Sequence, residues 1–126
     1  MHAIPKSIAT SAVALFMGTG AALAHHGWFW TADGEFVLEG IITEIYLGNP
    51  HATLTVQAED ELWHVDLAPP SRTAAAGFVE GVAEIGDEVI LTGQRSADMD
   101  ELVMKAVRIT IDGVNYDVYP DRAPDS

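Results

Sequence analysis

The chain has 126 residues, enough for one domain with a modest core, and its 19 acidic and 6 basic side chains give a formal charge of −13. It contains no cysteine, which excludes disulfides, thiolate metal sites, iron–sulfur clusters and cysteine-attached haem. The acidic excess disfavours nucleic acids as partners, because a surface that binds phosphates needs clustered Lys and Arg side chains.

Residues 1–24 have the pattern of a secretory signal peptide. Lys6 supplies a positive charge near the amino terminus, residues 8–23 form an apolar stretch without formal charge, and Ala22-Leu23-Ala24 satisfies the small-x-small cleavage rule. A single-pass anchor is the alternative, but the stretch is shorter than the ~20 residues that a bilayer requires. We therefore expect export to the periplasm and cleavage after Ala24, so that the mature protein starts at His25 and has no membrane segment.

The rest of the chain shows the two-residue periodicity of β-strands. Strands are expected at 36–47, 51–58, 62–67, 85–93 and 101–111, with a short last one at 114–119. Glu59-Asp60 is expected as the turn between the second and third strands, which would place Thr55 opposite His64. Between the third and fourth strands, residues 71–82 predict a short helix with Ser71 as its N-cap.

This order of elements predicts an all-β domain, a small OB-like five-stranded barrel over residues 25–119, with one short helix between strands 3 and 4. A small β-sandwich of the same strands is the alternative. The tail, residues 120–126, is expected to be disordered. Alternation puts His64 and Asp66 on the outer surface. The expected inner layer includes Leu54, Val56, Trp63, Val65, Val89, Leu91, Val103 and Val107.

No catalytic motif is present, and an enzyme is not favoured; a copper oxidase is a remote alternative. Histidines are the candidate ligands for a metal. With His25 as the first residue, its α-amine and imidazole can chelate one ion, and His51 or His26 can supply a third nitrogen. Three nitrogens suit Cu(II), which heads the divalent affinity order. His64 is expected to be a surface histidine, about 13 Å along the hairpin from His51.

Two functions follow from these residues. The first is an exported metal-binding protein that carries or buffers copper, or assists a metalloenzyme. The second is a metal-free periplasmic module that binds an envelope protein or a small apolar ligand, using aromatic side chains that would otherwise fill the core. The aromatic residues concerned are Trp28, Phe29, Trp30 and Trp63.

Four features together resemble an uncharacterised periplasmic family. They are the His25-His26-Gly27 start, Asn49-Pro50-His51, Trp63 in the third strand, and the Gly-Asp-x-Val-x-Leu-x-Gly pattern at residues 86–93. The resemblance covers nearly all of residues 25–119 and implies an exported β-barrel with no assigned activity. The chain departs from the family pattern in its aromatic run at residues 28–30, and in Asp66, which stands near the position where a Glu is usual.

Overall fold

The structure is a computed structural model that describes residues 27–125. The chain divides after Trp30 into two units, Met1–Trp30 and Thr31–Ser126. In the described part of the first unit, the indole nitrogen of Trp30 donates a hydrogen bond of 3.0 Å to the carbonyl oxygen of Gly27. Over residues 27–125, no helix has the length and hydrophobicity that crossing a bilayer would require. The predicted signal peptide lies outside the described residues.

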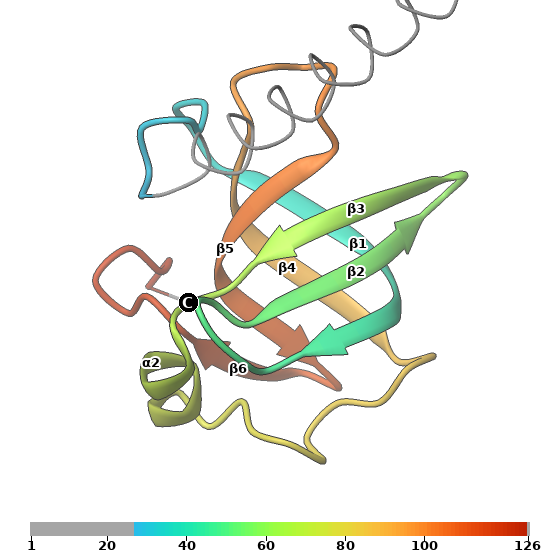
Figure 1. Cartoon of the computed structure of the whole chain (residues 1–126), viewed down its shortest axis with the longest axis vertical. Helices are drawn as coiled ribbons and strands as arrows, with labels where there is room; N and C mark the ends of the chain where they lie inside the picture. The colour runs from blue at the N-terminus through green and yellow to red at the C-terminus, as the bar shows by residue number, and fades with distance from the viewer. Residues whose placement is uncertain (1–26, 126) are drawn as a thin grey trace, which may run out of the picture. The chain divides into compact units, whose positions relative to one another are not determined.

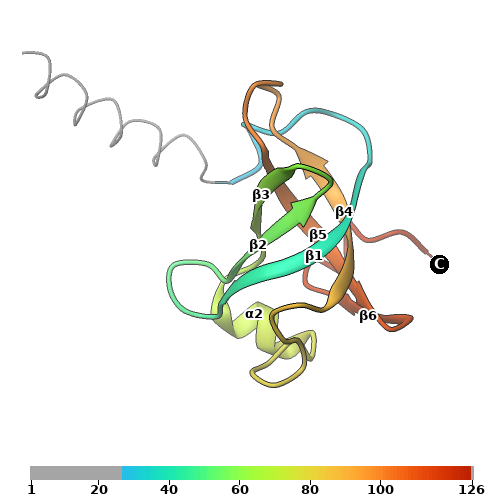
Figure 2. The same ribbon diagram turned by 90° about the vertical axis from the view of Figure 1, so that its right-hand side faces the viewer.

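The second unit is a closed β-barrel, as predicted (Figures 1 and 2). Its sheet has the strand order β3-β2-β1-β4-β5-β6, and a parallel pairing between β3 and β5 closes the first five strands into a ring. The closure rules out the sandwich. The elements are β1 (Phe36–Tyr46), β2 (Thr53–Ala58), β3 (Glu61–Asp66), α2 (Pro70–Ala75), β4 (Glu88–Arg95), β5 (Val103–Ile111) and β6 (Val114–Asp117).

The hairpin of β2 and β3 has the predicted register, with Thr55 opposite His64. Its turn is Glu59-Asp60, and Glu59 adopts the left-handed conformation with φ 57°. Because the register is as expected, the inner face is too: Leu54, Val56 and Val65 are fully buried, and Trp63 is 5% exposed. The hairpin therefore contributes its apolar face to the barrel interior.

Strand β5 faces the interior differently from the prediction. Thr92 of β4 pairs with Arg108 of β5, but the next residue, Gly93, pairs with Ala106, so Val107 is an extra residue in β5. Such a bulge exchanges the inner and outer positions beyond it. Val103 is only half-buried, whereas Val107 is buried, at 5% exposed, and is the extra residue of the bulge. The core residues of β5 are Met104, Ala106, Ile109 and Ile111.

The helix is shorter than the predicted span of 71–82. It ends at Ala75, and Gly77 follows it with φ 92°, a backbone conformation that glycine adopts without strain. Its N-cap is Pro69, which makes no capping hydrogen bond through its side chain, so the prediction that Ser71 caps the helix is wrong. Both views place α2 at one end of the barrel, opposite the end that carries the loop between β4 and β5 (Figures 1 and 2).

Candidate functional site

The predicted metal ligands fall partly outside the described residues. His25 and His26 are not described, whereas His51 is half-buried in the loop after β1, directly following the cis peptide bond between Asn49 and Pro50. His51 stands four residues before Thr55, the partner of His64, so the two described histidines are about 13 Å apart along the hairpin. Among residues 27–125, no three His, Asp or Glu side chains form a group suited to a metal ion.

His64 pairs with the carboxylate of Asp66, a residue whose burial was not predicted from the sequence. Its Nε2 lies 3.0 Å from Oδ1 of Asp66, two residues along the same face of β3. Asp66 was expected on the outer surface beside His64, but it is 7% exposed because the parallel pairing of β3 with β5 places it next to Lys105. The hydrogen bond to Asp66 raises the pKa of the His64 imidazole, which remains exposed to solvent.

Lys105 is the most unusual side chain beside Asp66. It is 3% exposed, and burial lowers the pKa of its amine. Its Nζ lies 5.6 Å from the ring centroid of Tyr119, and burial raises the pKa of the Tyr119 phenol. This pair was not predicted from the sequence. The available signal was a single Lys within the otherwise apolar segment 102–107.

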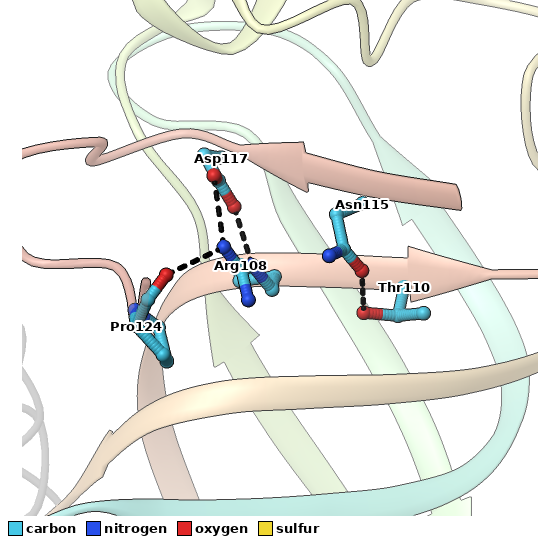
Figure 3. Close-up of polar contacts among 5 residues, drawn as sticks. All are labelled: Arg108, Thr110, Asn115, Asp117 and Pro124. Atoms are coloured by element: carbon cyan, nitrogen blue, oxygen red, sulfur yellow. Dashed lines mark hydrogen bonds and ion pairs between the residues drawn. The ribbon is translucent and has the colours of Figure 1, made fainter. Parts of the chain in front are cut away.

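Arg108 of β5 joins the tail to the sheet (Figure 3). Its Nε and one Nη donate to the two carboxylate oxygens of Asp117 at 2.6 and 3.1 Å, and the same Nη donates to the carbonyl oxygen of Pro124 at 2.8 Å. The hydrogen bonds from Arg108 lower the pKa of Asp117. Pro124 belongs to the tail that was expected to be disordered, and this contact gives it a defined partner on β5.

A second arginine covers the opposite end of the barrel from α2. The guanidinium carbon of Arg95 lies 4.9 Å from the ring centroid of Trp63 and 5.6 Å from that of Phe36, and the two rings are 5.1 Å apart. One Nη of Arg95 also donates to the carbonyl oxygens of Met99 and Glu101, which holds the loop between β4 and β5. Trp63 therefore fills the core rather than an open ligand groove.

The aromatic run after the histidines is mixed in its exposure. Trp30 is 8% exposed and Trp28 is half-buried, whereas Phe29 is 75% exposed. A phenyl ring with three quarters of its surface in water contributes little to a core. Of the four aromatic residues singled out in the sequence, Phe29 is thus the one most exposed to solvent.

Comparison with known proteins adds a family match. Family of unknown function (DUF6152) matches residues 13–102 of the chain. No curated protein matches this chain. Among solved structures, a similar one is the crystal structure of the ZRD-deleted mutant of TiaS in complex with agmatine, with 18% sequence identity and a TM-score of 0.49. That match covers 67% of this chain and 26% of the other, so the present chain spans about a quarter of that protein's length.

Proposed function

This chain belongs to the family of unknown function DUF6152, and on that premise we propose that it is an exported periplasmic protein that binds Cu(II) as a carrier, a buffer or an accessory to a metalloenzyme. The observation that carries the proposal is the position of His25 and His26 directly after the cleavage pattern Ala22-Leu23-Ala24. Cleavage there turns an ordinary histidine into a bidentate ligand, because the first residue of a chain offers both an α-amine and an imidazole.

The chemistry of these donors favours copper. An α-amine with a reference pKa of about 7.7–8.0 gives up its proton to a metal at little cost near neutral pH. Two nitrogens of His25 and the imidazole of His26 or His51 make a three-nitrogen set, and the tetragonal geometry of Cu(II) accepts water as the fourth ligand. The absence of cysteine removes the thiolates that would compete for the ion.

Two measurements on protein recovered from the periplasm test this proposal. Its intact mass is expected to correspond to a chain that starts at His25, and its copper content to approach one equivalent. A mass that corresponds to the uncleaved chain would refute the chelate, because His25 would then have no free α-amine. Cleavage after Leu23 would instead make His26 the third residue, where an amine, two amide nitrogens and an imidazole bind copper in a square plane, and the same mass measurement distinguishes the two chemistries.

Two single variants identify the third ligand, and another serves as their control. We expect His26→Gln or His51→Gln to weaken Cu(II) binding and to remove one nitrogen from the hyperfine pattern of the spin-resonance spectrum. His64→Gln is the matched control, because His64 is exposed and already pairs with Asp66. If the spectrum is unchanged in both His26→Gln and His51→Gln, neither imidazole is a ligand, and this result would contradict the three-nitrogen site built on His25.

The exposure of Phe29 favours a second candidate, a metal-free module that binds an envelope protein or a small apolar ligand. The same preparation separates the two functions. Protein that contains no copper even when cells are supplied with it supports the module, and Phe29→Ser is then the variant expected to lose the partner. Copper near one equivalent supports the carrier.

A further inference from the structure

The outer face of the sheet carries exposed aliphatic side chains where β1 and β4 pair. Ile90 pairs with Glu39, and Glu88 pairs with Ile41. These four side chains lie on one face of the sheet, because residues two apart on a strand and directly paired residues share a face. Ile41 and Ile90 are each 39% exposed, whereas Val89, which points the other way, is 2% exposed. Two large apolar side chains and two carboxylates therefore meet the solvent together.

A hollow of about 450 Å³ lies over this part of the sheet, a volume within the range of pockets that hold small molecules. The four residues that make up these two pairs all line it. The hollow continues over Thr110 of β5, the partner of Ile90, and reaches Asp112 in the turn before β6. Its lining is therefore both apolar and acidic, with Asp112 as a third carboxylate.

The negative charge of the hollow is not balanced by the protein itself. The carboxylates of Glu39, Glu88 and Asp112 make no hydrogen bond or ion pair within residues 27–125. No Lys or Arg of the described part of the chain lines the hollow. In the same part of the chain, no three carboxylate or imidazole side chains form a group suited to a single metal ion. The hollow is thus complementary to an occupant whose positive charges are separated in space.

We propose that this hollow binds a small organic dication, an alkyl chain with an amino group at each end. Glu39 and Glu88 are diagonal neighbours across the β1–β4 ladder, about 7–8 Å apart, so each carboxylate accepts hydrogen bonds from a different ammonium group. Ile41 and Ile90 lie between them and cover the alkyl chain, which removes apolar surface from water. None of these residues is a proposed copper ligand, so neither proposal depends on the other.

Nuclear magnetic resonance of the ¹⁵N-labelled, copper-free protein tests the hollow, with 1,4-diaminobutane, butylamine and magnesium chloride titrated separately at constant ionic strength. We expect 1,4-diaminobutane to give saturable shifts confined to amides of residues 39–41, 88–90 and 110–113. Butylamine has the same alkyl chain but one charge, and it is expected to bind at least fivefold more weakly. Magnesium that binds as tightly as the diamine at these amides would overturn the proposal, because attraction to negative charge would then suffice.

Glu39→Gln and Glu88→Gln are each expected to weaken the binding of 1,4-diaminobutane at least threefold. Both side chains are exposed, and the spectrum itself shows whether the variants are folded. Asp100→Asn is the control for net charge, because it removes one exposed carboxylate from the loop at the opposite end of β4 from Glu88, and it is expected to change the affinity less than twofold. Shifts that grow without saturation, or equal affinities in all three variants, would overturn the proposal.

Discussion

Gly93 of β4 lies directly against the backbone of Lys105 in β5, with no room for a side chain between them. A Cβ at Gly93 would overlap the carbonyl oxygen of Lys105 and come within 2.9 Å of the Cα of Ala106. This close approach occurs at the β5 bulge, where Gly93 pairs with Ala106 and Val107 is the extra residue. The glycine therefore permits the close approach of β4 and β5 at the bulge.

Gly93→Ala is expected to lower the free energy of unfolding by about 1–3 kcal/mol, because an added methyl group must displace backbone rather than a flexible side chain. Chemical denaturation measures it. Glu88→Ala is the control on the same strand, since Glu88 is exposed. Equal free energies of unfolding in the two variants would show that β4 and β5 separate easily and that the bulge is not tightly packed.

Trp63→Ala is expected to cost ~3–5 kcal/mol, the usual penalty for emptying the space of a buried aromatic side chain. Trp63 is 5% exposed and contacts Phe36 and Arg95, so its loss also removes the stack at that end of the barrel. Leu62→Ala provides the comparison, because Leu62 is its neighbour in the chain and is 58% exposed. An unfolding midpoint of Trp63→Ala as high as that of Leu62→Ala would contradict the core position of Trp63.

Much of the fold could be predicted from sequence because its determinants are local. Alternation and the Glu59-Asp60 turn together define the register of β2 and β3, and Thr55 faces His64 as expected. The facing of β5 could not be predicted, because the extra residue Val107 is defined only by what pairs with β4. The burial of Asp66 was missed for the same reason: it follows from the parallel pairing of β3 with β5, which joins segments distant in the sequence.

The candidate site was less predictable than the fold. Histidines attract attention in a sequence because they are few, and two of the three candidates, His25 and His26, lie outside the described residues. The surroundings of the Tyr119 ring could not be predicted from spacing, since Arg72 comes from α2 and Lys105 from β5. The fold brings both side chains to this ring, the Arg72 guanidinium carbon to 5.3 Å and the Lys105 Nζ to 5.6 Å from its centroid.

The stability of the protein is expected to depend on the protonation of His64. Asp66 raises the pKa of His64 in the folded state, so protonated His64 stabilises the fold. This contribution is fully present below the unfolded-state pKa of about 6.5 and is lost as the pH rises through the folded-state pKa. Unfolding free energies of the unchanged protein and of His64→Gln should therefore differ more at low pH than at high pH.

Asp66→Asn provides an independent check on the cause of this pKa shift. We expect the titration of the His64 imidazole, followed by nuclear magnetic resonance, to move to lower pH in this variant. A His64 titration that does not move would assign the raised pKa to other groups, such as Glu44, which also acts on His64.

Arg108→Lys is expected to release the tail from the sheet, because the single nitrogen of an ammonium lacks the planar fork of donors with which the guanidinium reaches both oxygens of Asp117 and the carbonyl of Pro124 (Figure 3). We expect a loss of about 1.5–3 kcal/mol in unfolding free energy and faster amide dynamics at Ala123 and Asp125. Thr110→Ala, which removes the exposed hydrogen bond to Asn115 on the same hairpin, is the control. Tail dynamics that match those of the control would contradict the anchoring role of Arg108.

The central claim is that the mature terminus chelates copper, and the affinity of a chain extended by Gly-Pro before His25 tests it most directly. The extension keeps every side chain but separates the α-amine from the His25 imidazole. A single added residue would be ambiguous, because His26 would become third and bind copper through backbone amides, whereas proline has no amide N–H to give up. Copper titration should show binding weakened roughly tenfold or more relative to the chain that starts at His25, the scale on which even outer-shell changes act. Equal dissociation constants for the two chains would contradict the terminal chelate.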